Sequence, residues 1–187
     1  MKKFLLRFVC FILSSLAWVQ NSQSEPYSAD LVTVAREQRS TSKVYVSEGR
    51  LRTEATMGKV QIVTIARLDE KIVYVLLPVQ KLFVEKPLSE KDGILAYVSD
   101  PNAKRELVGT ETLNGQTCDK YKMMVREKMF YVWITKDSHT PLMMFSPESE
   151  TRIEWSNVQV GPQPADLFKP PGDFQKFTTP PVVIEKR

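Results

Sequence analysis

The chain has 187 residues, two cysteines, one histidine and a formal net charge of +4. Three of its basic residues, Lys2, Lys3 and Arg7, lie in an N-terminal segment that we expect to be removed, which leaves 23 basic against 22 acidic residues. A nucleic-acid interface needs lysine and arginine clustered in clear excess. The two signs are instead interspersed in the rest of the chain, so composition excludes nucleic acid as the expected partner.

The first 24 residues are typical of a secretory signal peptide. A basic start precedes the apolar run from Phe8 to Val19, which is shorter than the roughly 20 residues that a membrane span needs. Small residues at Ser22 and Ser24 permit cleavage before Glu25. We therefore predict a periplasmic protein of a Gram-negative-type envelope, with no stable membrane span after cleavage. An uncleaved N-terminal anchor is the alternative.

The rest of the chain is predicted to form one domain, residues 25–177, followed by a flexible C-terminal tail, residues 178–187. A chain of this length buries about two-thirds of its unfolded surface in one core. Without the signal peptide it has a single cysteine, Cys118, so no internal disulfide forms. Packing has to supply the stability.

From Tyr27 onward, apolar residues recur mostly at every second position and turn residues interrupt them at short intervals. This pattern predicts an antiparallel meander rather than helices. The strand-like runs occupy residues 27–36, 44–48, 50–57, 60–66, 72–77, 81–85, 106–113, 116–126, 129–135, 141–145 and 151–160.

Three local signals refine this pattern. Every residue from Ile72 to Leu77 is apolar, so this strand is predicted to be covered on both faces and to lie near the middle of the sheet. The Asn114-Gly115 dipeptide predicts a tight hairpin, because both residues tolerate positive φ. A change of apolar phase in the last run predicts a bulge near Ser156 and Asn157.

The segment from residue 87 to 105 breaks the alternation. Ser89 and Asp92 resemble a capping box, and the apolar residues after them have helical spacing: Ile94, Leu95, Tyr97 and Val98. We predict one short helix that covers the two-sided strand. A long loop is the alternative. Later in the chain, a turn at residues 165–168 is expected to hold Leu167 and Phe168 against the sheet.

These elements predict a mainly β fold. About ten antiparallel strands twist strongly, and an open sheet of that size has to be covered or closed. We therefore expect a strongly curved sheet, a half-open barrel, with the helix over its concave side.

The sequence offers no recognisable catalytic, cofactor or metal constellation. His139 lies in what reads as a surface turn, beside Asp137 and Ser138. One histidine and one cysteine do not complete a tetrahedral zinc site without carboxylates. We expect Cys118 to be a small buried hydrophobe; pairing with a partner is the alternative. Neither the phosphate-binding loops nor the serine-hydrolase motif is present, so we predict a protein that is not an enzyme.

The remaining signal is apolar. Methionines and aromatic residues recur across the strands, and methionine adapts to irregular apolar partners. A curved sheet with one helix encloses a groove when its side chains do not fill it. The residues predicted to line such a groove are Tyr74, Leu76, Met123, Phe130, Trp133, Met144 and Trp155. An ordinary core is the alternative.

The stretch from Asp100 to Gly115, with Cys118 to Tyr121, Tyr131 to Ile134 and Val160 to Pro164, resembles a bacterial family of exported proteins of unassigned function. The resemblance extends from about Tyr27 to Phe177. That family in turn resembles the periplasmic outer-membrane lipoprotein carriers, LolA and LolB. This resemblance implies a bent antiparallel sheet around an apolar cavity, and a lipid or lipidated protein as ligand. Those carriers have several cavity-plugging helices, whereas this sequence predicts one at most.

Two functional hypotheses follow. The first is a non-catalytic binding or carrier protein for an apolar ligand, a lipid or acyl chain, in the cell envelope. The second is an interaction module that offers an edge strand or an apolar patch to an envelope protein.

Overall fold

The computed structural model describes residues 25–89, 95, 98, 103–125 and 127–178. The predicted signal peptide, all of the tail except Thr178, and most of the predicted helix lie outside the described residues. Among the residues that are described, no helix is both long and apolar enough to cross a membrane.

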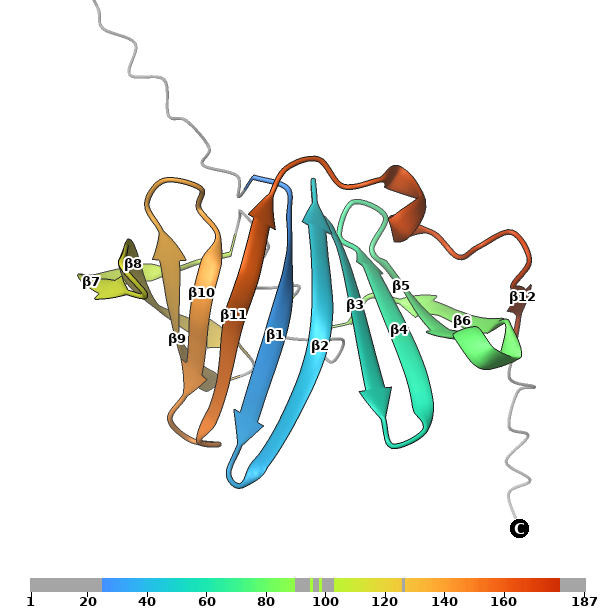
Figure 1. Cartoon of the computed structure of the whole chain (residues 1–187), viewed down its shortest axis with the longest axis horizontal. Coiled ribbons are helices and arrows are strands. Elements are labelled where there is room, and N and C mark those ends of the chain that lie inside the picture. Colours follow the sequence, from blue (N-terminus) through green and yellow to red (C-terminus); the bar gives the residue numbers. More distant parts are fainter. Residues whose placement is uncertain (1–24, 90–94, 96–97, 99–102, 126, 179–187) are drawn as a thin grey trace, which may run out of the picture.

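The described chain forms one sheet of twelve strands, with two short 3-10 helices, as Figure 1 shows. The strands are β1 (Tyr27–Ala35), β2 (Gln38–Ser47), β3 (Arg50–Met57), β4 (Val60–Arg67), β5 (Ile72–Leu77), β6 (Leu82–Pro87), β7 (Glu106–Leu113), β8 (Gln116–Val125), β9 (Lys128–Thr135), β10 (Pro141–Ser146), β11 (Thr151–Val160) and β12 (Gln175–Lys176). The 3-10 helices are η1 (Pro78–Gln80) and η2 (Ala165–Phe168). The predicted fold class, a strongly curved and unclosed β sheet, is confirmed.

The strand order shows two meanders joined side by side. It runs β12-β6-β5-β4-β3-β2-β1-β11-β10-β9-β8-β7. Strand β1 lies near the centre, paired with β2 on one side and with β11 on the other. All pairs are antiparallel except the short β12, which runs parallel to β6. In Figure 1 the flanks formed by β5 and β6 and by β7 and β8 both recede behind the central strands, so the sheet bends away from the viewer.

This order obliges the chain to cross the sheet twice, once over each face. The connection from β6 to β7 joins strands near opposite ends of the sheet. Leu88, Leu95, Val98 and Ala103 from this connection pack on the concave face. The segment after β11 crosses the opposite, outer face to reach β6, and residues 161–178 of this segment are called the C-terminal strap below.

The local signals predicted from sequence are largely confirmed. Asn114 and Gly115 have φ values of 50° and 77° at the β7–β8 hairpin. The register between β1 and β11 shifts opposite Asn157, whose φ is 51°. Strand β2 begins at Gln38, earlier than predicted, because Gln38 to Lys43 is polar and extends beyond the apolar core.

The two-sided strand is covered as predicted, but its position in the sheet is not central. In β5, Val73 is buried on the concave face and Leu76 on the outer face, each with 1% of its surface exposed. The strand is third from the β12 end of the sheet. The prediction of a central place was wrong because the outer cover comes from the C-terminal strap, not from further strands.

The strap is anchored by aromatic burial as well as by polar contacts. Phe168 is 1% exposed and packs with Val63, Ile65 and Leu76. The Arg50 guanidinium lies 5.3 Å from the centre of the Phe168 ring. The turn predicted at residues 165–168 is therefore confirmed as an anchor.

Replacing Phe168 with alanine should lower the free energy of unfolding by about 3–5 kcal/mol, the range for removing a buried aromatic side chain. Phe177, which is 50% exposed in the same strap, is the matched control. We expect Phe177→Ala to cost under about 1 kcal/mol, as surface substitutions do. Urea unfolding followed by circular dichroism measures both, and equal losses would contradict the role of Phe168 as the anchor.

Candidate ligand-binding face

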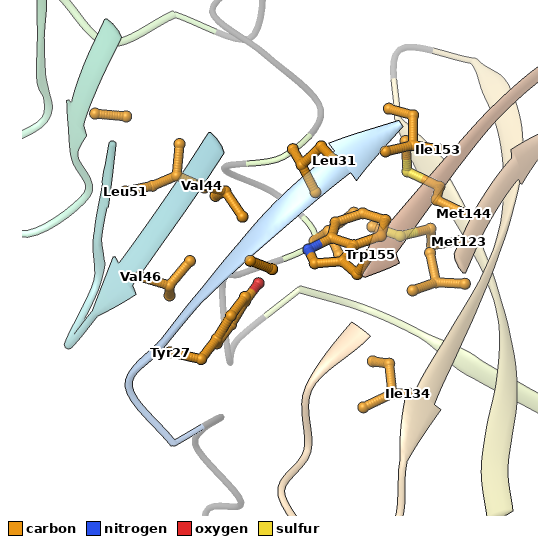
Figure 2. Close-up of a cluster of buried hydrophobic side chains, with 14 of the residues drawn as sticks. Tyr27, Leu31, Val44, Val46, Leu51, Met123, Ile134, Met144, Ile153 and Trp155 are labelled. Atoms are coloured by element: carbon orange, nitrogen blue, oxygen red, sulfur yellow. The ribbon is translucent and has the colours of Figure 1, made fainter. Parts of the chain in front are cut away.

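The concave face carries one continuous apolar cluster. Its buried members come from nine strands and the β6–β7 connection, and Figure 2 shows many of them around Trp155. They are Tyr27, Ala29, Leu31, Val44, Val46, Leu51, Ala66, Val73, Val98, Met123, Val125, Val132, Ile134, Met144, Ile153 and Trp155. We call this set the concave cluster. The alternation of each strand places every second side chain on this face.

The cover of the concave cluster is thin in the described residues. Leu95 and Val98 are helical, as the sequence predicted. They are three positions apart and so point to the same side of a helix. Leu88 and Ala103 add contacts from the two ends of the connection. The side chains described in this connection that pack over the concave cluster are therefore all aliphatic.

The structure divides the seven residues predicted to line a groove. Four of them belong to or pack against the concave cluster: Met123, Phe130, Met144 and Trp155. Tyr74 and Leu76 lie instead on the outer face under the strap, and Trp133 lies in a separate outer cluster with Cys118 and Leu142. The seven therefore do not share one surface. Alternation in the sequence separates the two faces of a strand, but it does not show which face of a fully apolar strand is concave.

The two tryptophans of the described chain have opposite hydrogen-bonding states. On the outer face, Trp133 Nε1 donates to Glu111 Oε2 at 2.8 Å. In the concave cluster, Trp155 is 3% exposed and its Nε1 has no hydrogen-bond partner. Buried indole N–H groups usually find an acceptor. Trp155 therefore carries an unused donor inside an apolar site.

A second unpartnered polar atom lies on the same face. Ser146 Oγ is buried and has no partner, and the residue is 1% exposed. Met144, two positions earlier in β10, belongs to the concave cluster, and strand alternation puts Ser146 on that face too. The pair Met144 and Ile153 lies between the Ser146 and Trp155 positions in the register of β10 and β11.

The outer-face tryptophan belongs to a charged group that fixes its acceptor. Lys120 Nζ lies 2.9 Å from Glu111 Oε1 and 4.6 Å from the centre of the Trp133 ring system. The hydrogen bond from Lys120, and then that from Trp133, hold the pKa of the Glu111 carboxyl below its ordinary value of 4.5. Because the pKa of Glu111 is lowered in the folded protein, this network contributes its full stabilisation of the fold above about pH 4.5. That stabilisation is lost as the pH falls through the lowered pKa of Glu111.

Acid titration should therefore move the indole N–H resonance of Trp133 in a proton–nitrogen NMR spectrum and leave that of Trp155 in place. The step should come below pH 4.5, because the pKa of Glu111 is lowered. Glu111→Gln keeps an acceptor but removes the titrating group, so it should abolish the step. A Trp155 resonance that titrates together with that of Trp133 would contradict the separation of the two faces.

Cys118 and Ser138, two of the residues considered for catalysis, are engaged in packing and in hydrogen bonds. Cys118 is fully buried, and burial raises the pKa of its thiol. The Ser138 hydroxyl, next to His139 in the chain, is hydrogen-bonded to Thr135 and Thr140. Within the residues that the structure describes, no group of three or more histidine, cysteine, aspartate or glutamate side chains is placed to hold a metal ion.

A polar hollow that shares Leu31 with the concave cluster was not predicted. It has a volume of about 730 Å³ and is lined mainly by β1, β2 and β3. Asp30, Lys43 and Glu54 are cross-strand neighbours in it, so acidic and basic groups alternate across the hollow. No described polar atom there is buried without a partner. The signal for this hollow in the sequence is the polar run from Gln38 to Lys43. The structure shows that this run is the first part of a longer β2.

A family model described as "Domain of unknown function (DUF4412)" matches residues 28–141. The chain belongs to the DUF4412 family. The prediction of a family of unassigned function is thereby confirmed. No curated protein matches this DUF4412 chain significantly.

Solved structures resemble the DUF4412 chain at low sequence identity. An uncharacterised conserved protein from Thermus thermophilus has a TM-score of 0.60 and 18% identity, covering 85% of this chain and 93% of its own. PNGF-II has a TM-score of 0.53 and 11% identity, covering 82% of this chain and 31% of its own. A LolA superfamily protein from Nitrosomonas europaea has a TM-score of 0.45 and 8% identity, covering 80% of this chain and 94% of its own. The first two likenesses establish the fold and nothing beyond it.

Proposed function

We propose that this protein is a non-catalytic binding or carrier protein of the cell envelope that holds an apolar ligand, a lipid or acyl chain, on its concave face. The observation that carries the proposal is the concave cluster itself, which spans nine strands under one crossing connection. Ligand sites are mostly apolar with a few polar groups that set orientation. The unpartnered Trp155 Nε1 and Ser146 Oγ fit that description.

The side chains of the site suit a flexible apolar ligand. Met123 and Met144 contribute to the concave cluster, and Phe130 packs against it. Methionine side chains are unbranched and polarizable, so they adapt to ligands of irregular shape. The proposed location in the periplasm rests on the signal-peptide pattern of the first 24 residues.

The test is lipid retention after purification from the periplasm of a Gram-negative host, measured by native mass spectrometry and by lipid extraction. We expect the purified protein to carry lipid. Met123→Gln should reduce the amount of lipid per protein at least several-fold, because it puts an amide on the concave face. Met124→Gln is the matched control, since Met124 lies next in the chain and is 57% exposed, against 3% for Met123.

Circular dichroism establishes that both variants fold. Repeated absence of lipid from the wild-type protein would contradict the proposal. Equal lipid content in the Met123→Gln and Met124→Gln variants would contradict the concave face as the place of binding.

A second candidate function is an interaction module for an envelope protein, and it is favoured by the free edge at β7. Strand β7 pairs only with β8 among the described strands, and Leu107 and Val108 on it are 57% and 45% exposed. Exposed edge strands are templates for the addition of a strand from another chain. Partner binding at this edge would leave the concave face unused.

Photo-crosslinking from this edge distinguishes the two functions. Val108→Cys provides the attachment point, because Cys118 is fully buried. For the interaction module we expect a specific crosslinked partner in the envelope, lost when Leu107→Lys is added. A protein that stays monomeric and uncrosslinked while it retains lipid would eliminate this second candidate.

A further inference from the structure

We infer that the gap between β2 and β3 binds an extended acidic peptide segment of a partner protein, which adds to β2 as an antiparallel strand. The β2–β3 pairing runs from the hairpin turn to the pair Ser42 and Ala55 and ends there. Beyond this pair the two strands separate, as Figure 1 shows toward the lower ends of β2 and β3, and we call this place the β2–β3 fork. The inference goes beyond the proposed function, because lipid on the concave face plays no part in it.

The polar hollow lies at the β2–β3 fork. It is lined by Arg39 to Lys43 of β2 and by Glu54 to Thr56 of β3, with contributions from β1, β4 and β11. Its volume of about 730 Å³ lies within the range of ligand sites. The first four residues of β2, Gln38 to Thr41, are all exposed. The fork is therefore an open space that the side chains around it do not fill.

The backbone of β2 lacks a strand partner on the side of the fork. The β1–β2 hairpin has a two-residue loop closed by the pair Ala35 and Gln38, and such a pair exchanges both of its hydrogen bonds. Bonding directions alternate along an antiparallel strand, so Gln38 and Ser40 bond to β1 and the N–H of Arg39 points toward the fork. Among the described strands, none pairs with Arg39 on that side. Unpaired backbone of this kind is a template for a strand from another chain.

The edge at the fork lacks two backbone features that block strand addition, proline and the β-bulge. The outer edge at β7 is interrupted by a register shift between Leu107 and Gly109, and β6 ends on Pro87. The segment from Gln38 to Thr41 contains no proline and pairs with β1 without a register shift. The fork therefore offers a regular backbone template to an extended polypeptide.

The carboxylates beside the fork already have partners. Asp30 lies opposite Lys43 in the β1–β2 register, and Glu54 lies opposite Lys43 in the β2–β3 register. Asp30 Oδ2 accepts a hydrogen bond from Asn157 Nδ2 at 2.8 Å. Glu54 Oε1 accepts one from Arg52 Nε at 2.7 Å. In the part of the chain that the structure describes, neither acid forms an ion pair with Lys43.

The cations of the fork have no such partner. Arg39 and Lys43 line the hollow on the same face of β2, and neither forms an ion pair or a side-chain hydrogen bond with a described residue. In an added strand, the residues that hydrogen-bond to Arg39 and Thr41 also place their side chains on this face. Carboxylates at these positions would meet both cations, so we expect glutamate or aspartate at every second residue of the partner segment.

The experiment titrates the exported protein with the acetylated peptide amide Thr-Glu-Thr-Glu-Thr and follows the backbone amides by NMR. We expect the Arg39 resonance to shift and the hydrogen exchange of this amide to slow at least several-fold. The amide of Ser40, which already bonds to β1, should exchange slowly with or without the peptide. The analogue Thr-Lys-Thr-Lys-Thr should bind about ten-fold more weakly, because each of two exposed charge pairs contributes a few-fold.

N-methylated peptides separate strand pairing from charge. Methyl groups on the two glutamate nitrogens remove the donors that face β2, so this peptide should lose binding. Methyl groups on the threonine nitrogens leave those donors in place, so this second peptide should bind at least several-fold more tightly than the first. Both peptides have the same charge.

A pair of lysine variants tests the charge of the fork. Lys43→Gln should weaken binding of the acidic peptide about three-fold, the effect of one exposed charge pair. Lys128→Gln is the matched control, because Lys128 is also exposed and begins β9, four strands away from β2. This control should leave the affinity unchanged. Circular dichroism establishes that both variants fold.

Each contrary outcome overturns a stated part of the inference. Equal affinity of the two N-methylated peptides means that charge alone attracts the peptide, and overturns strand addition. No shift at Arg39 at millimolar peptide, or shifts confined to β7, overturns the fork as the site. Protection of the Arg39 amide that rises with protein concentration alone assigns the fork to a second copy of the chain. Equal binding of the glutamate and lysine peptides, or equal effects of Lys43→Gln and Lys128→Gln, overturns the acidic partner. None of these results bears on lipid retention, so the proposed function stands or falls separately.

Discussion

The structure depends on one topological constraint, which is that β6 and β7 are neighbours in sequence but lie near opposite ends of the sheet. Ten steps between adjacent strands separate them, about 48 Å along the sheet at the usual strand spacing. The 18 residues from Leu88 to Arg105 connect them. Only a bent sheet lets so short a connection cross while part of it is helical, so the bend and the cover arise together.

The same constraint explains why the protein has two apolar faces and not one. The strap after β11 has to reach β6 across the outer side, where Phe168 and its neighbours bury Ile65 and Leu76. Strands near the β6 end are thus covered on both faces, and in the part of the chain that the structure describes the crossing connection packs over the concave face. The outer cover is fixed by a buried aromatic ring and a parallel strand pair. Among the described residues, the contacts on the concave side come from aliphatic side chains of the β6–β7 connection.

Polar groups follow the same division. On the outer face, Trp133, Glu111 and Lys120 satisfy one another at the surface. On the concave face, Trp155 and Ser146 are buried without partners. Natural proteins keep few such groups, and those that persist are commonly functional. The two tryptophans thus differ in whether a described residue accepts the hydrogen bond of the indole.

The sequence by itself determined the fold class, nearly all strand positions, the hairpin at Asn114 and the bulge at Asn157, because alternation and turn residues act over a few neighbouring positions. It also determined that Leu167 and Phe168 anchor the end of the chain. Only the tertiary structure decided the order of the strands, and with it which face of Ile72–Leu77 or of β9 is concave. For this reason the sequence places Tyr74, Leu76 and Trp133 with Trp155, whereas in the structure they lie on the other side. Alternation assigns side chains to two faces, but which face becomes the interior depends on pairings between residues far apart in the chain.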